Sequence, residues 1–208
     1  MKKELHIAVL VMAAGASRRM NGIKQLMPWK DSNFLLETIK TVEKSNAASV
    51  HVVLGSNAKL ISKECNLIEK KINVIVNPNW SNGLGNSIAY GVKALLKKLP
   101  SVDAILICLA DQPLLDHNYL NSLINVFENN SCKIAATNYD KKIGVPALFS
   151  NIYFQHLSQL EGDFGAKELL NNDELSIISL ETLDGIIDID TKLEYNELIN
   201  RTNAENKP

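Results

Sequence analysis

Short apolar runs alternate along the chain with segments in which apolar residues recur at helical spacing. The runs predict strands over residues 5–12, 50–54, 72–76 and 104–109. They are rich in β-branched residues, as is typical of strands covered on both faces. The periodic segments predict helices over residues 32–44, 59–70, 87–99 and 118–128. This alternation predicts right-handed βαβ crossovers and a three-layer α/β fold with a mostly parallel central sheet.

The alternation becomes less regular in the last third of the chain. Strands are predicted at residues 133–138, 146–149, 176–180 and 186–189, and helices at residues 151–160, 165–170 and 192–199. Asp31 or Ser32 is expected to cap the first helix. Because no repeat or linker interrupts the pattern, we expect a single domain over residues 1–201 and a disordered polar tail over residues 202–208.

The composition is that of a globular protein with a sizeable core. The 208 residues are 46% hydrophobic and 22% charged. The 22 Lys and Arg residues nearly balance the 23 Asp and Glu residues, which argues against nucleic-acid or membrane-surface partners. Three scattered cysteines without a CxxC pair indicate neither a disulfide framework nor a structural zinc site. A reducing cytoplasm is therefore the expected location.

The amino-terminal apolar run has a second possible interpretation. Lys2 and Lys3, the apolar residues 7–14 and the small residues around Gly15 are similar to a secretory signal. We favour a buried strand instead, because the polar residues that follow complete a candidate phosphate-binding loop. No apolar run approaches the ~18 residues of a membrane helix. We therefore expect a soluble protein without a membrane partner.

Small and basic residues follow the first predicted strand, from Ala13 to Lys24. Small residues let backbone N–H groups approach a phosphate, and Arg19 and Lys24 would add positive charge. The segment lacks both the G-x-G-x-x-G fingerprint and the Gly-Lys-Ser/Thr of a P-loop. It is either a triphosphate-binding loop or a surface loop with solvated arginines.

Carboxylates follow two other predicted strands. Asp111 lies in the segment of residues 109–113 at the end of the fourth predicted strand, where it could bind Mg²⁺ or simply form a turn. Strand alternation would place Asp188 and Asp190 on one side of the chain. Asp190 could equally be the N-cap of the closing helix. Residues 77–88 contain polar donors and two glycines, which suit either a base-recognition segment or a plain loop-to-helix junction.

Taken together and in order, these segments resemble the molybdenum cofactor cytidylyltransferase family, within the MobA-like, Rossmann-like nucleotidyltransferases. The first family motif, A-A-G-x-S-x-R-M-G-x-x-K, is met by residues 13–24, except that Asn21 replaces a glycine. Asn tolerates a left-handed backbone, so the loop is expected to survive this change. L-A-D-Q-P is met by residues 109–113 and D-I-D-T by residues 188–191.

Three further motifs extend the resemblance over nearly the whole chain. N-P-x-W-x-x-G-x-x-x-S is met by Asn77, Pro78, Trp80, Gly83 and Ser87. G-x-P-x-x-F is met by Gly144, Pro146 and Phe149. G-D-x-G-A-R is met by Gly162, Asp163, Gly165 and Ala166, with Lys167 in place of the arginine.

The resemblance implies that a terminal phosphate of the molybdopterin cofactor attacks the α-phosphorus of CTP and that pyrophosphate leaves. By the same resemblance, Arg19, Lys24 and Asp111 are catalytic, and Asp111 and Asp190 hold Mg²⁺. The implied nucleotide-binding residues are Ala13, Ala14, Gly15, Ala16, Ser17, Arg18, Arg19, Lys24, Asn77, Gly83, Ser87 and Asp111. The implied acceptor-side residues are Gly144, Pro146, Asp163 and Lys167.

The choice of base depends on Ala14. Related guanylyltransferases usually have glycine there, and the methyl group of Ala14 narrows the pocket, which favours CTP over GTP. A guanylyltransferase or a sugar- or alcohol-phosphate cytidylyltransferase remains an alternative. So does a non-catalytic nucleotide sensor or cofactor chaperone, although such a protein has no use for groups that stabilise a leaving pyrophosphate. A molybdoenzyme or an insertion chaperone is a candidate partner.

Overall fold

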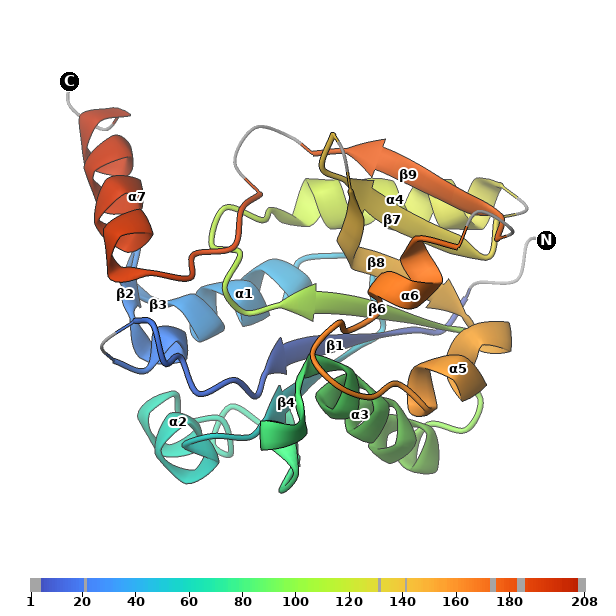
Figure 1. The fold of residues 1–208 in the computed structure, drawn as a ribbon, viewed down its shortest axis with the longest axis horizontal. Coiled ribbons are helices and arrows are strands. Elements are labelled where there is room, and N and C mark those ends of the chain that lie inside the picture. The colour runs from blue at the N-terminus through green and yellow to red at the C-terminus, as the bar shows by residue number, and fades with distance from the viewer. Residues whose placement is uncertain are drawn as a thin grey trace.

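The computed structural model describes residues 5–20, 22–130, 132–140, 142–172, 175–182 and 186–205. A seven-stranded sheet forms its centre, with the strand order β5-β4-β1-β6-β8-β7-β9 (Figure 1). The strands are β1 (Ile7–Ala13), β4 (Ser49–Leu54), β5 (Asn73–Val76), β6 (Ala104–Leu109), β7 (Ile134–Asn138), β8 (Ile143–Ser150) and β9 (Ile177–Glu181). Only β8 is antiparallel to its neighbours. The predicted α/β class with a mostly parallel sheet is confirmed.

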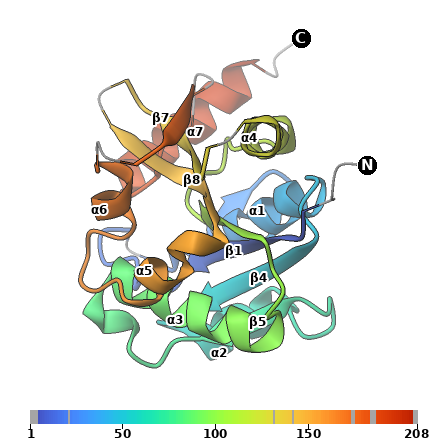
Figure 2. The same cartoon turned by 90° about the vertical axis from the view of Figure 1, so that its right-hand side faces the viewer.

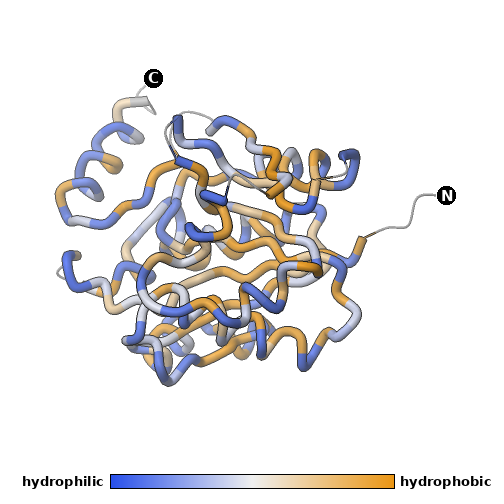
Figure 3. The backbone as a smooth tube through the Cα atoms, turned by 45° about the vertical axis from the view of Figure 1, so that its right-hand side comes forward, coloured by the Kyte–Doolittle hydropathy of each residue, from blue (hydrophilic) through white to orange (hydrophobic). Residues whose placement is uncertain are grey.

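Helices cover both faces of the sheet (Figures 1 and 2). One face packs against α1 (Phe34–Glu43), α2 (Ala58–Glu64) and α4 (His117–Asn129). The other packs against α3 (Leu84–Lys98), α5 (Phe154–Ser158) and α6 (Lys167–Leu170). Every residue of β1 is buried, and Val9 faces the first layer while Leu10 faces the second. Figure 3 shows the hydrophobic strands at the centre, with hydrophilic positions on the outer helices.

The closing helix, α7 (Lys192–Glu205), lies beside a small antiparallel ribbon of β2 (Pro28–Trp29) and β3 (Ser32–Asn33) (Figure 1). A third apolar cluster joins them; it includes Trp29, Phe34, Tyr195 and Leu198, and the rings of Phe34 and Tyr195 pack edge to face with their centroids 5.9 Å apart. Short 3₁₀ helices occur at Lys24–Leu26 (η1), Trp80–Asn82 (η2) and Asn151–Tyr153 (η3).

The strand order places a crevice beside β1. The chain adds β4 and β5 on one side of β1 and then crosses to add β6 on the other side. The carboxyl ends of β1 and β6 are therefore adjacent, and the Ala110 amide donates to the Met12 carbonyl at 3.1 Å. Ligands of open α/β sheets bind at such a switch point.

Four local predictions differ from the structure. Asn33, not Asp31 or Ser32, caps α1, because Ser32 pairs with Trp29 in the ribbon. Helix α2 ends at Glu64 rather than residue 70, because Asn66 has a left-handed φ of 50°.

The other two differences concern the carboxyl-terminal part. Residues 186–189 do not form the predicted strand; their backbone joins the site through the Ile189 amide, which donates to the Asp111 carbonyl at 3.0 Å. Helix α7 continues to Glu205, past the predicted start of the disordered tail, and residues 206–208 lie outside the described residues. Asn21, with its expected left-handed backbone, also lies outside them. Within the described ranges, no helix is long and apolar enough to cross a membrane.

Candidate functional site

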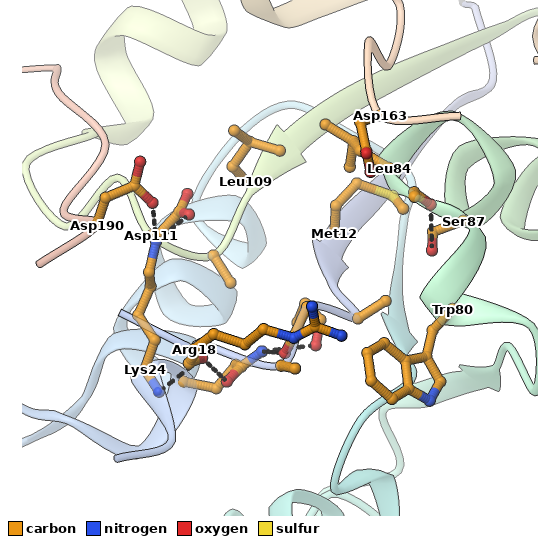
Figure 4. A pocket seen from close by; sticks show the side chains of 18 of the residues that line it. Met12, Arg18, Lys24, Trp80, Leu84, Ser87, Leu109, Asp111, Asp163 and Asp190 are labelled. Atoms are coloured by element: carbon orange, nitrogen blue, oxygen red, sulfur yellow. Dashed lines mark hydrogen bonds and ion pairs between the residues drawn. The ribbon is translucent and has the colours of Figure 1, made fainter. Parts of the chain in front are cut away.

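A cavity of about 510 Å³ opens at the carboxyl ends of β1 and β6 (Figure 4). It has charged groups from the β1 loop on one side and the start of α3 on the other. The predicted site residues that line it are Ala13, Ala14, Gly15, Ala16, Ser17, Arg18, Arg19, Lys24, Gly83, Ser87, Asp111, Asp163 and Asp190. Five parts of the chain, around residues 13–24, 83–87, 111, 163 and 190, therefore meet in one cavity.

Lys24 joins the two carboxylates that were predicted to hold a metal ion. Its Nζ lies 2.6 Å from Asp111 Oδ2 and 2.7 Å from Asp190 Oδ1. Figure 4 shows Asp111 and Asp190 directed toward the same point. Burial alone would lower the pKa of Lys24, but the two carboxylates overcome this effect, and the net pKa of Lys24 is raised. Lys24 is therefore a cation between two anions.

Asp190 is held by side chains rather than by helix capping. Arg19 Nη2 lies 2.9 Å from Asp190 Oδ2. Burial opposes ionisation of Asp190, but Lys24 and Arg19 together lower its pKa. The N-terminus of α7 is closed by Thr191 and Glu194: the Glu194 carboxylate accepts from the amides of Asp190 and Thr191 at 2.7 and 2.8 Å. The Glu194 amide donates to Thr191 Oγ1 at 3.2 Å, which completes a capping box. The capping interpretation of the Asp190 side chain is therefore wrong.

The donor set at Asp111 fits a divalent cation that completes its coordination with phosphate and water. Asp111 Oδ1 is buried and has no hydrogen-bond partner among the described residues, although buried polar atoms are usually paired. In the described part of the chain, no group of three or more His, Cys, Asp or Glu side chains could hold a metal. Two carboxylates with substrate phosphates are the ligands that Mg²⁺ commonly takes.

The buried side-chain amide of Gln112 holds the segment that carries Asp188. Gln112 Nε2 donates to Asp188 Oδ1 and to the Tyr139 hydroxyl, both at 2.9 Å, and to the Val145 carbonyl at 3.2 Å. Burial, followed by the charge of Asp111, raises the pKa of Asp188. Burial also raises the pKa of Tyr139. Asp188 thus contacts Gln112 and Asp190 contacts Lys24, so the two acidic residues have different partners.

The structure does not bring four of the predicted site residues to the cavity. Asn77 is fully buried, and its Nδ2 donates to Ser87 Oγ at 3.1 Å, so it supports a lining residue from behind. Gly144 and Pro146 belong to β8, where the intervening carbonyl of Val145 contacts Gln112. Lys167 is exposed at the start of α6.

Close backbone contacts bring Asp163 to the cavity. The Gly85 amide donates to the Gly162 carbonyl at 2.8 Å. A Cβ on Gly83 would lie 2.3 Å from that same oxygen, and Gly83 has a φ of 105°. Glycine is therefore required at residue 83 for two reasons, and the loop of residues 161–165 can lie directly against the start of α3.

Several lining residues were not predicted as part of the site. They are Met12, Gln25, Trp80, Ser81, Leu84, Leu109 and Ala110. Gln25 follows Lys24 directly, and Trp80 is part of the N-P-x-W-x-x-G-x-x-x-S motif. Both residues could therefore have been predicted from the sequence. Their positions in the cavity depend on the folding of η1 and η2.

An open sheet with a loop of small and basic residues at its switch point, facing a carboxylate, defines a Rossmann-like nucleotidyltransferase. The family model described as the MobA-like NTP transferase domain matches residues 9–177. The chain therefore belongs to the MobA-like NTP transferase family, and the family resemblance is confirmed at this level.

Similar proteins agree with this assignment. The chain is 29% identical over 194 residues to the purine catabolism protein PucB of Bacillus subtilis (strain 168), covering 88% of this chain and 91% of PucB. The crystal structure of Rv0371c from Mycobacterium tuberculosis H37Rv has a TM-score of 0.83 at 26% identity, over 95% of this chain and 99% of that one. A structure of Rv0371c in complex with manganese has a TM-score of 0.79 at 24% identity, over 95% of this chain and 100% of that one.

Proposed function

We propose that this protein transfers CMP from CTP to the terminal phosphate of the molybdopterin cofactor. An oxygen of the acceptor phosphate forms a bond to the α-phosphorus, the bond from that phosphorus to the oxygen bridging to the β-phosphate breaks, and pyrophosphate leaves with the electron pair. The observation that carries the proposal is the meeting of Lys24 with Asp111 and Asp190 at 2.6 and 2.7 Å, beside the loop of residues 13–19.

The loop and its cations would bind the triphosphate. Arg18, Arg19 and Lys24 all line the cavity, as do the small residues from Ala13 to Ala16. Arginine can contact two phosphate oxygens at once, and lysine supplies a compact charge. Because little covalent chemistry is required of the protein, positioning and charge neutralisation would supply most of the rate enhancement.

Asp111 and Asp190 would hold Mg²⁺. The bound ion would supply positive charge to the triphosphate and to the leaving pyrophosphate. Lys24 Nζ contacts one oxygen of each carboxylate, so its charge would compete with the ion, and a Lys24 released from the carboxylates would be free to contact the phosphates. The manganese complex of Rv0371c supports the choice of a divalent ion, and the preference for Mg²⁺ belongs to this proposal.

Ala14 would favour cytosine over guanine, because it lines the cavity, and a methyl group there leaves less room than glycine would. On the acceptor side, Asp163 is the predicted residue with a place in the cavity. Gly144 and Lys167 would contact only the part of the acceptor that extends beyond the cavity. Pro146 is buried in β8, where its carbonyl accepts from Thr137 Oγ1 at 2.8 Å, so it would support this side of the site rather than contact the acceptor. Asn77 would act through Ser87 rather than on the nucleotide itself.

The cellular setting completes the proposal. The chain would act as one domain over residues 1–201, in the cytoplasm, without a nucleic-acid partner. The product would pass to a molybdoenzyme or to an insertion chaperone, since a nucleotide-bearing cofactor must be handed to a protein that uses it.

Pyrophosphate release tests the function. Purified protein with Mg²⁺ and molybdopterin would be incubated with CTP, GTP, ATP or UTP in turn, and we expect release with CTP. Release with GTP instead would identify a guanylyltransferase, and release only with a sugar or alcohol phosphate would identify a different acceptor. Binding of nucleotide without release from any of them would favour a sensor or chaperone.

A further inference from the structure

Gln25 makes three hydrogen bonds into the loop that follows β1. It is 5% exposed and belongs to η1. Its Nε2 donates to the carbonyl of Ala13 at 2.8 Å and to that of Gly15 at 3.1 Å. Its Oε1 accepts from the Ser17 hydroxyl at 3.3 Å. The amide group is thus connected to alternate residues of the loop, and no other side chain among the described residues hydrogen-bonds to the Ala13 or Gly15 carbonyl.

These bonds determine the direction of the loop amides. In a trans peptide, the carbonyl of one residue and the N–H of the next point in opposite directions. Fixing the carbonyls of Ala13 and Gly15 on Gln25 therefore turns the N–H groups of Ala14 and Ala16 away from it. Within the described ranges, neither N–H donates a hydrogen bond, and both residues line the cavity. Unpaired N–H groups that face a cavity suit an anionic ligand.

The adjacent bonds are consistent with this arrangement. The Ala14 carbonyl accepts from the Ser56 amide at 3.0 Å, so the intervening peptide is held from the opposite direction. Ser17 has a left-handed φ of 54°, and its hydroxyl accepts from the Lys24 amide at 3.0 Å. The short helix η1 thus positions two side chains. It places the Lys24 ammonium group between the carboxylates of Asp111 and Asp190, and it places the Gln25 amide against the loop carbonyls.

We propose that Gln25 is a positioning residue, which orients the loop peptides so that the N–H groups of Ala14 and Ala16 bind substrate phosphate. Without the Gln25 amide, the carbonyls of Ala13 and Gly15 would be free to rotate toward the cavity, where their partial negative charge would repel the triphosphate. The inference rests on the proposed function in that a nucleoside triphosphate occupies the cavity.

The substitution Gln25→Met tests the proposal, because it keeps the length of the side chain and removes all three hydrogen bonds. Dissociation constants would be measured for CTP, inorganic tripolyphosphate and cytidine. Since two carbonyls lose their donors, we expect CTP and tripolyphosphate to bind about tenfold more weakly. Cytidine, which has no phosphate, should keep its affinity. The matched control is Gln155→Met, at an exposed position on α5, which should change none of the three.

The inference is overturned if Gln25→Met binds tripolyphosphate as tightly as the wild type, or if it loses cytidine to the same extent as CTP. Amide NMR on the wild type provides a measurement that does not depend on the variant folding. The Ala14 and Ala16 N–H resonances should shift on adding tripolyphosphate, and unmoved resonances would also refute the proposal. If both amides respond but no nucleotide releases pyrophosphate, the proposed function fails and the role of Gln25 stands.

Discussion

The substitution Lys24→Met should make the protein bind a divalent metal ion more tightly in the absence of nucleotide. In the wild type, a divalent ion would compete with the ammonium group of Lys24, whose Nζ lies 2.6 Å from Asp111 Oδ2 and 2.7 Å from Asp190 Oδ1. The Lys24 side chain is 11% exposed, and the two carboxylates are 24% and 36% exposed, so solvent weakens these contacts only in part. Methionine has a similar length and no charge.

We work the magnitude from the two lost contacts. A hydrogen bond between charged groups contributes about 1.5–3 kcal/mol, and partial exposure reduces each to about 1 kcal/mol. Removing both should make about 2 kcal/mol available to the incoming ion, which corresponds to ~30-fold tighter binding. Asp111 Oδ1, which is buried without a partner, adds an oxygen that the ion can use. Arg19 still contacts Asp190, so the gain should not exceed this estimate by much.

The assay is titration with Mn²⁺ in the absence of nucleotide, followed by the electron paramagnetic resonance signal of the free ion. The matched control is Lys40→Met, which removes an exposed ion pair to Glu37 at 2.6 Å and should leave Mn²⁺ affinity unchanged. Weaker or unchanged Mn²⁺ binding in Lys24→Met would refute the reasoning, because it would mean that Lys24 does not compete with the metal. The same variant should lower kcat far more than it weakens CTP binding, since Lys24 would act on the leaving pyrophosphate.

Three other changes have expected outcomes. Asp111→Ala should reduce Mg²⁺-dependent pyrophosphate release by at least ~100-fold while the melting temperature stays within a few degrees of the wild type. Burial, and then the charge of Lys98, lower the pKa of His51 from 6.5 to about 4, so His51 is neutral when folded. The unfolded chain binds this proton more readily, and stability should fall by about 2 kcal/mol from pH 7 to pH 5, measured by urea denaturation. Gly85→Ala should destabilise the fold by about 1–3 kcal/mol, because its Cβ would lie 2.5 Å from the Glu161 carbonyl.

A specific result would contradict each of these three predictions. Full activity of Asp111→Ala would remove Asp111 from the proposed metal site. An unchanged pH dependence in His51→Leu would assign the acid sensitivity to other groups. Unaltered stability in Gly85→Ala would show that the loop of residues 161–165 can move away from α3 without cost.

Positive and negative side chains of the site pair with one another in the structure. Lys24 and Arg19 pair with Asp111 and Asp190, so these four charges largely compensate one another. Partly buried charges without partners are costly, and this pairing lets the protein keep them in a cavity before substrate arrives. The nucleotide would bind the cations Arg19 and Lys24, and the metal would bind the carboxylates of Asp111 and Asp190. Each ligand would release the groups that the other one binds, so we expect each to promote the binding of the other.

The local pattern of the sequence determined most of the secondary structure. β6 spans Ala104–Leu109, as predicted, because a strand covered on both faces has a continuous apolar run that ends where the polar turn begins. The small and basic residues after β1 and the carboxylate after β6 were also recognisable, since each depends on residues that are close together in the chain. The prediction that Lys24 and Asp111 belong to one site follows because β1 and β6, which precede them, are parallel and end at the same edge of the sheet.

Only the tertiary structure decided which distant groups meet. Asp190 is 166 residues from Lys24, and its choice between capping and pairing depended on Thr191 and Glu194 closing α7 instead. Asn77 has a polar side chain typical of a binding loop, yet packing buries it behind Ser87. The hydrogen bonds of Gln25 to the β1 loop likewise depend on how η1 folds back on it. Hydrophobic periodicity reports which face of an element is buried, whereas the partners of a polar side chain depend on contacts between segments that only the folded chain brings together.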